Sequence, residues 1–221
     1  MIKFLDILKE SDDNIFIPRG SKEEKDKVLI KITNEKIQEY IRNGFEGDLE
    51  LENSPIKFLP RNLTKVGGKL NLMYSQIEKL PDNFIVNGYL DLESCKNLKS
   101  LPNGLKVKDG LDLRDTNITF LPSDLKVGDN LKLMRSQIEK LPDNLIVNGY
   151  LWLDGCKNLK SLPNGLKVKY NLDLRDTNIT FLPSDLQVGG ILYLFGTPIA
   201  KMYTKKQIRE MVPGVKGRIK L

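Results

Sequence analysis

The fifteen residues LDLRDTNITFLPSDL occur twice in this chain, at 111–125 and again at 172–186. They belong to a longer duplication, in which the blocks 70–130 and 131–191 differ at 11 of 61 positions. An active site is normally built once, whereas a supersecondary unit is repeated when several copies must stack to bury a core. We therefore interpret the segment as a repeated structural unit and not as two copies of a catalytic site.

Pairs of leucines extend the pattern beyond the duplication. A fixed period near 20 residues is typical of a solenoid, in which each turn buries its apolar residues against its neighbours. The Leu-x-Leu alternation predicts one short strand per turn, with both leucines inward and the residue between them outward. The pairs are spaced 20 or 21 residues apart and are Leu49/Leu51, Leu70/Leu72, Leu90/Leu92, Leu111/Leu113, Leu131/Leu133, Leu151/Leu153, Leu172/Leu174 and Leu192/Leu194.

A small residue that can donate a hydrogen bond stands five positions after the first leucine of each pair. A tight turn after each strand leaves backbone carbonyls inside the fold, where an unpaired carbonyl is costly. We therefore predict a buried ladder in which these side chains donate from turn to turn. Its members are Ser54, Ser75, Cys95, Thr116, Ser136, Cys156, Thr177 and Thr197.

The unit L-x-L-x-x-(S/T/C)-x-I-x-x-L-P-x-x-L-x-V-x-G, repeated from 49 to about 203, resembles the leucine-rich repeat family in its short, Leu-Pro-containing bacterial and phage form. The segment GTPIAKMYTKKQIREMVPGVKG is similar to the closing segment of repeat proteins from large phages. The resemblance implies an α/β solenoid with a curved parallel sheet on its concave face, an irregular convex side and helical caps at both ends. It also implies a protein-binding scaffold in a phage or bacterial host-interaction setting.

The chain divides into a helical N-terminal cap over 1–48, eight repeats over 49–203, and a cap helix with a short tail over 204–221. Ser21-Lys-Glu-Glu24 and Thr204-Lys-Lys-Gln207 each fit a capping box, which begins a helix. The opening MIKFLDILKE predicts an amphipathic helix, and the closing GRIKL predicts a last strand. An apolar stripe at helical spacing should cover the first repeat strand, and it consists of Ile30, Ile37, Tyr40 and Ile41.

Composition limits the chemistry and the location. The chain has no histidine, which removes the commonest general base and metal ligand. Its net charge of +6 comes from 35 basic residues interleaved with 29 acidic ones, so the surface is mixed. No apolar run is long enough for a membrane span or a signal peptide. We expect a cytoplasmic monomer, of a bacterium or of an infected host cell, without enzyme activity, cofactor or metal.

The two cysteines occupy the same place in their repeats. Cys95 and Cys156 are three turns apart, which corresponds to about 14 Å at the spacing of strands in a sheet. A disulfide requires Cα atoms within about 7 Å, so no bridge joins them. We therefore expect two buried structural thiols.

The differences between the two blocks indicate where a partner binds. Nine of the 11 differing positions lie in a predicted strand or within two residues of one, and none is an inward leucine. We favour a diversified binding surface on the outward face of the sheet over random drift, with its anchor near Trp152, because Trp, Tyr, Met and Arg are enriched at interface hot spots. The candidate residues are Tyr74, Tyr89, Arg114, Met134, Arg135, Tyr150, Trp152, Arg175, Tyr193 and Phe195. A terminal segment folded over Tyr193 and Phe195 is the structural alternative.

Three other functions stay open with less support. Lysines recurring along one side could track phosphates, although no aromatic column interleaves with them for base stacking. Asp112/Asp115 and Asp173/Asp176 place carboxylates together, but Arg114 and Arg175 between them indicate salt links. Self-assembly at the GRIKL edge is the third. The lysines are Lys96, Lys99, Lys106, Lys108, Lys157, Lys160, Lys167 and Lys169.

Overall fold

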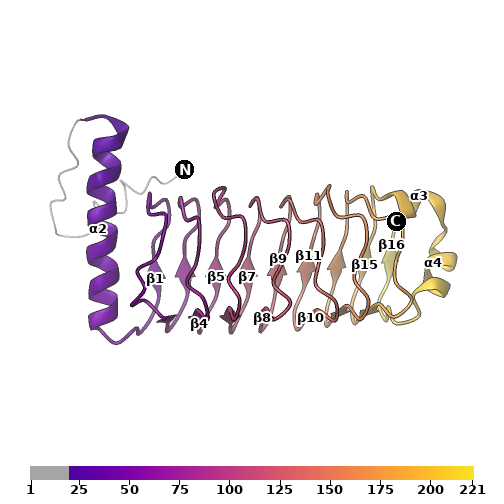
Figure 1. Ribbon diagram of the computed structural model, residues 1–221. Coiled ribbons are helices and arrows are strands. Elements are labelled where there is room, and N and C mark those ends of the chain that lie inside the picture. Colours follow the sequence, from indigo (N-terminus) through magenta and orange to yellow (C-terminus); the bar gives the residue numbers. More distant parts are fainter. Residues whose placement is uncertain (1–19) are drawn as a thin grey trace.

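The chain forms a parallel β-solenoid whose turns are about 20 residues long. The computed structural model describes residues 20–221, so the amphipathic helix predicted at the start of the chain lies outside the described residues. The turns stack in a row, with a long helix at one end and two short helices at the other (Figure 1). Among the described residues, no helix combines the length and the apolar character that crossing a membrane requires.

A nine-stranded parallel sheet runs along one face of the solenoid. Its strands follow sequence order, and leucines pair in register, as Leu111 does with Leu131. The predicted parallel strands are confirmed, and the GRIKL segment adds the ninth beside β15. The strands are β1 (Leu49–Glu50), β3 (Leu70–Asn71), β5 (Leu90–Asp91), β7 (Leu111–Asp112), β9 (Leu131–Lys132), β11 (Leu151–Trp152), β13 (Leu172–Asp173), β15 (Leu192–Tyr193) and β16 (Ile219–Lys220).

The part of each turn outside the nine-stranded sheet is mostly irregular, as expected, but it includes one short strand along an edge of the solenoid (Figure 1). These strands form two small parallel sheets, because in each of these turns a Lys-Val, Ile-Val or Gln-Val pair is extended, buries its valine and bonds to a neighbouring turn. The Lys106 N–H donates to the Phe84 carbonyl at 3.0 Å, and the Lys108 N–H donates to the Val86 carbonyl at 2.9 Å. One sheet contains β2 (Lys65–Val66), β4 (Ile85–Val86), β6 (Lys106–Val107) and β8 (Lys126–Val127), and the other contains β10 (Ile146–Val147), β12 (Lys167–Val168) and β14 (Gln187–Val188).

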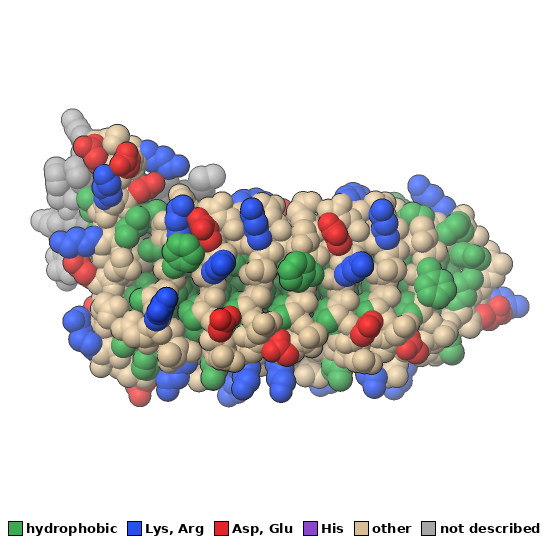
Figure 2. Space-filling view, in the orientation of Figure 1, with side chains coloured by type: hydrophobic (Ala, Val, Ile, Leu, Met, Phe, Trp, Pro, Cys, Tyr) green, Lys and Arg blue, Asp and Glu red, His purple; other side chains and the backbone are tan. Residues whose placement is uncertain are grey.

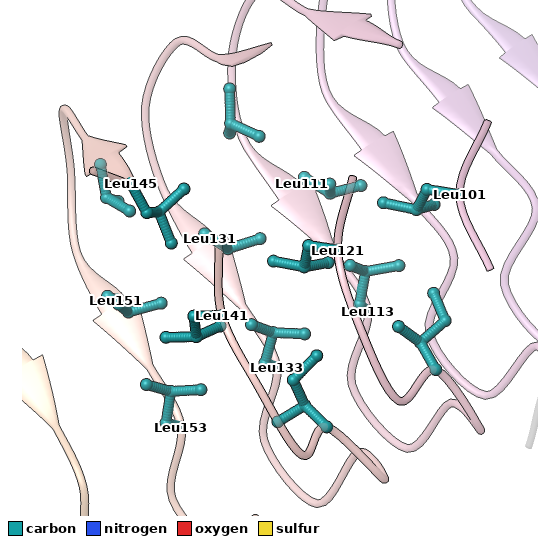
Figure 3. Packing of buried hydrophobic residues seen from close by; sticks show 14 of the residues in the cluster. Leu101, Leu111, Leu113, Leu121, Leu131, Leu133, Leu141, Leu145, Leu151 and Leu153 are labelled. Carbon is teal, nitrogen blue, oxygen red and sulfur yellow. The ribbon is translucent and has the colours of Figure 1, made fainter. Parts of the chain in front are cut away.

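The core lies between the nine-stranded sheet and the Leu-Pro segment of each turn. Figure 3 shows Leu113 and Leu133 of the strand side facing Leu121 and Leu141 of the Leu-Pro side. Both strand leucines are fully buried. Each turn packs mainly on its two neighbours, so the apolar core is continuous along the solenoid.

All eight predicted ladder residues are buried, and the cysteines and threonines among them donate to carbonyls in two different patterns. The Cys95 Sγ donates to the Leu72 carbonyl of the preceding turn at 3.0 Å. The Thr116 Oγ1 instead donates to the Leu113 carbonyl of its own turn at 2.7 Å. The threonines depart from the expected turn-to-turn pattern because a hydroxyl readily closes a local bond to a carbonyl three residues back.

The helix α2 (Lys22–Arg42) packs on the first turn. Its predicted capping box at Ser21 is present, and Ile37 and Tyr40 are buried as expected. Thr33 adds a contact that the apolar stripe did not include, since its Oγ1 lies 3.1 Å from Oγ of Ser54. Ile30 departs from the expectation, because it is exposed.

The other end has α3 (Pro198–Met202) and α4 (Lys205–Met211), followed by β16. The predicted capping box at Thr204 is present, and Ile208 and Val212 are fully buried. β16 belongs to the nine-stranded sheet, so the last strand predicted from the GRIKL segment is confirmed.

Candidate functional site

The outward surface of the nine-stranded sheet, here called the sheet face, has different chemistry at two equivalent places. In the first block Asp91 pairs in register with Asp112, and in the second block Trp152 pairs with Asp173. The strand pairing is therefore the same in both blocks. The difference between the two places arises from the side chains alone.

The first place is a network of salt bridges centred on Asp112. Arg114 Nε lies 2.8 and 2.9 Å from the two carboxylate oxygens, and Lys132 Nζ lies 3.3 Å from Oδ2. The Tyr89 hydroxyl donates to Oδ2 at 2.9 Å. Asp112 was placed in an outward column by its phase, yet it is fully buried, because these three neighbours cover it.

The pKa values of these carboxyls move in opposite directions. Burial raises the pKa of Asp91, and the charge of Asp112 adds to the effect. Burial by itself would also raise the pKa of Asp112. Hydrogen bonds from Arg114 and Tyr89 together outweigh burial and hold the pKa of Asp112 below its ordinary value. Burial and the neighbouring Asp112 raise the pKa of Tyr89, which therefore stays a neutral donor.

Carboxylates of Asp91, Glu93 and Asp112 approach one another within 4.8 Å, a spacing that a metal ion could bridge. Arg114 Nη2, however, lies 2.5 Å from Glu93 Oε2 and 2.8 Å from Asp112 Oδ2. The guanidinium already supplies positive charge between the carboxylates. We assign no metal to this cluster.

The second place is a group of three aromatic rings, here called the aromatic cluster, and it consists of Tyr150, Trp152 and Tyr170. The Tyr150 and Trp152 rings are nearly parallel, with centroids 5.1 Å apart, and Tyr170 lies 5.2 Å from Tyr150. Lys132 Nζ lies 5.8 Å from the Trp152 centroid, and Lys169 Nζ lies 5.3 Å from that of Tyr170. Tyr170 is exposed, whereas the other two rings are half-buried. The cluster is thus a preformed aromatic surface with lysines beside it.

Tyr170 is the member of this cluster that sequence reasoning missed. It precedes β13 by two residues, where strand alternation does not fix the direction of a side chain. A signal was present, since Asp109 in the first block becomes Tyr170 in the second. An acidic residue replaced by an aromatic one beside Trp152 could have identified it.

Tyr193 and Phe195 lie apart from the aromatic cluster. Tyr193 contacts cations instead, with Arg175 Cζ 5.6 Å and Lys220 Nζ 5.1 Å from its ring centroid. The final segment pairs beside Tyr193 as strand β16 and places only the Lys220 side chain over its ring, whereas the structural alternative had the segment folded over it. It does not cover Phe195, which is 65% exposed.

The remaining candidate residues are distributed along the sheet face. Tyr74 is exposed in the first block, and Met134 is half-buried between the two places. Arg135 is engaged by Asp115, with Nη2 2.6 Å from Oδ2. Tyr89 and Arg114 belong to the salt-bridge network. Of the ten predicted residues, only Tyr150 and Trp152 fall in the aromatic cluster.

The lysines considered for nucleic-acid binding are all exposed, but they do not form a single row. Lys106 and Lys167 lie in strands of the small sheets. Lys96 and Lys157 lie in the turns after β5 and β11, where their Nζ atoms donate to the carbonyls of Asp115 and Asp176. The positive charge is therefore spread around each turn, which favours a solvated surface over a phosphate track.

The two thiols give a direct prediction. Burial raises the pKa of Cys95 and of Cys156 to about 11, from an ordinary value of 9.0. Because only the thiolate reacts, we expect the folded protein at pH 8 to react with a chromogenic disulfide reagent roughly 100-fold more slowly than a free thiol. In urea both thiols should react at the free rate. Fast labelling of the folded chain would contradict the buried positions.

A scan against protein-family models and a search of curated proteins each found no match to this chain. The structure by itself defines the class of protein, a parallel β-solenoid with turns of about 20 residues.

Proposed function

We propose that this protein is a non-catalytic scaffold of the leucine-rich repeat type that binds a partner protein on its sheet face, in a phage or bacterial host-interaction setting. One observation supports this most directly. The aromatic cluster stands where the otherwise near-identical first block has Tyr89, Asp91 and Asp109. The repeat preserves the backbone at both places, and only the second presents a large aromatic surface.

The geometry of the cluster suits binding. Trp and Tyr are the residues that most often dominate interface energies, and they do so where water is excluded around them. Trp152 is held by stacking on Tyr150, so little side-chain freedom remains to be lost when a partner binds. Lys169 beside the rings favours a partner surface with an acidic residue near an apolar contact.

The state of the reactive side chains supports a scaffold without catalysis of its own. The Cys95 and Cys156 thiols are buried and donate to backbone carbonyls. The carboxylate of Asp112 is bound by Arg114 and Lys132. A nucleophile or general base needs access to a substrate, which neither arrangement offers.

We further propose that the terminal helices cap the solenoid. A solenoid leaves apolar core uncovered at each end unless another element packs there. Ile37 of α2 and Ile208 of α4 are fully buried, which supports this role. The binding surface is then confined to the faces between the caps.

The test exchanges residues that the fold already accepts. Trp152→Asp and Tyr170→Asp introduce the residues of the first block, so the double variant should keep the urea midpoint of the wild type. Tyr74→Arg, which copies Arg135, removes an exposed aromatic outside the cluster and is the matched control. We expect the immobilised wild type and control to capture a partner protein from lysate, and the double variant to bind the purified partner at least about 30-fold more weakly.

Equal binding by the double variant would contradict the proposal. Capture of nucleic acid alone, with an affinity that falls steeply as salt rises, would favour the lysines instead.

A further inference from the structure

A row of exposed side chains, here called the Phe strip, runs along the face opposite the nine-stranded sheet. It consists of the residue that precedes Leu-Pro in each turn, with phenylalanine at every third turn. The strip is Phe58, Lys79, Ser100, Phe120, Lys140, Ser161 and Phe181. The three phenylalanines are 55%, 57% and 61% exposed. Each precedes a leucine that points into the core, as Leu121 does in Figure 3, so the phenylalanine points outward.

Successive members of the strip are neighbours in space. Parallel bridges join Phe58 to Lys79 and Phe120 to Lys140. Beside the strip runs a second row, one residue earlier in each turn, here called the charged row. It consists of Lys57, Glu78, Lys99, Thr119, Glu139, Lys160 and Thr180. Figure 2 shows hydrophobic side chains recurring along the middle of one face, with basic and acidic side chains in the row above them.

The phenylalanines are evenly spaced. Three turns separate Phe58 from Phe120, and three separate Phe120 from Phe181, which corresponds to about 14 Å each at the spacing of strands in a sheet. Isolated exposed apolar residues are ordinary on protein surfaces. A row at one pitch is different, because a partner with the same pitch can contact all three rings at once. A second copy of this chain has that pitch by construction.

Two copies of the strip are complementary when they face each other and run in opposite directions, related by a two-fold axis at the turn of Phe120. Phe120 then meets its equivalent, and Phe58 of each copy meets Phe181 of the other. In the charged row, Glu78 faces Lys160 and Lys99 faces Glu139, and each pairing occurs twice. Lys57 faces Thr180, and in the strip itself each lysine faces a serine. No like charges oppose one another in either row.

The alignment without reversal has the opposite character. The two-fold axis would then run along the strip, so each strip residue would meet its own equivalent and Lys79 and Lys140 would each face a lysine. The charged rows of the two copies would lie on opposite sides of this axis and would not pair. Like charges in contact at an interface disfavour such a pairing. Only the reversed alignment makes every charged pair in the charged row attractive.

We propose that two copies of this chain associate through the Phe strip, reversed about a two-fold axis at Phe120. A two-fold contact of one surface with itself closes on two copies and leaves the sheet faces pointing away from each other, free for partners. The proposal departs from the monomer expected from the sequence. It does not depend on the function proposed for the aromatic cluster.

Sedimentation velocity of the full chain over a concentration series tests the proposal. Phe120→Glu places two carboxylates at the axis, and we expect the dimer dissociation constant to rise by about 30-fold or more. Phe195→Glu is the matched control, because this phenylalanine is similarly exposed but lies on the sheet face. The control should dimerise like the wild type.

A charge exchange tests the orientation. Lys99→Glu and Glu139→Lys should each weaken the dimer, since each creates two like-charge contacts across the axis. The double variant Lys99→Glu/Glu139→Lys should recover wild-type association, because it restores both pairs with their signs reversed. A monomeric wild type, equal effects of Phe120→Glu and Phe195→Glu, or no recovery in the double variant would each overturn the proposal. Larger assemblies that persist in Phe120→Glu would also overturn it and indicate end-to-end pairing at β16.

Discussion

Replacing Phe84 by alanine is expected to lower the free energy of unfolding by about 3–5 kcal/mol, because it removes the largest fully buried side chain among residues 20–221 and leaves a cavity. The ring lies directly before β4, and the Phe84 carbonyl accepts the Lys106 N–H that joins two turns. Alanine keeps this backbone bond, so the loss is expected in the packing of the core. Urea denaturation followed by circular dichroism measures it as a lower midpoint.

The second block supplies the control for this prediction. Leu145 occupies the equivalent position and is 7% exposed. At this position the two small sheets are separated, and a groove of about 720 Å³ opens between them. Phe84→Leu should therefore be accepted at a cost of about 1 kcal/mol. If alanine at Phe84 costs no more than leucine, the ring does not fill the core as its burial indicates.

Asp112→Asn is expected to destabilise the protein at pH 7 by about 3 kcal/mol. The change keeps the size of the side chain but removes the charge that pairs with Arg114 and Lys132, and Asp112 is fully buried. The two cations would then lose a partner inside a crowded network. Urea midpoints of the variant and of the wild type, compared at pH 7, measure the loss.

The effect should depend on pH in a defined direction. The pKa of Asp112 in the folded chain lies below its ordinary value of 3.8. Its contribution to stability is therefore present above about pH 3.8 and is lost as the pH falls through the folded pKa. The difference between the variant and the wild type should shrink in acid. A difference that stays constant down to the acid transition would contradict the role of the charge.

Asp91→Asn is the matched control, since the pKa of Asp91 is shifted in the opposite direction to that of Asp112. Burial raises the pKa of Asp91 above 3.8 in the folded chain. The contribution of the Asp91 carboxyl to stability is present below about pH 3.8 and is lost as the pH rises through the folded pKa. The charged carboxylate of Asp91 is therefore unfavourable to folding at pH 7. The asparagine variant should be slightly more stable than the wild type at pH 7, by less than about 1 kcal/mol, and this gain should vanish in acid.

The features predicted correctly from the sequence are local or periodic. The Leu-x-Leu alternation places leucines such as Leu113 and Leu133 in the core, because a strand presents alternate residues to opposite sides. The capping boxes at Ser21 and Thr204 begin helices, because the bonds involved span only three residues. The GRIKL strand was also predicted, although the turn between Leu192 and its partner Ile219 is lengthened by α3 and α4.

The tertiary structure decided what depends on neighbours from other turns. Asp112 is outward by phase yet buried, because Tyr89, Arg114 and Lys132 come from three different turns to cover it. Tyr170 joins Tyr150 and Trp152 from a position whose direction the strand pattern does not set.

The sequence alone thus determined the repeat, the strand phase, the inward leucines and the terminal helices of this protein. The tertiary structure decided which outward residues are covered, which rings stack and how the ladder bonds run. The physical reason is that backbone periodicity fixes where a side chain starts, whereas its contacts depend on residues about 20 positions away that only stacking of the turns brings alongside.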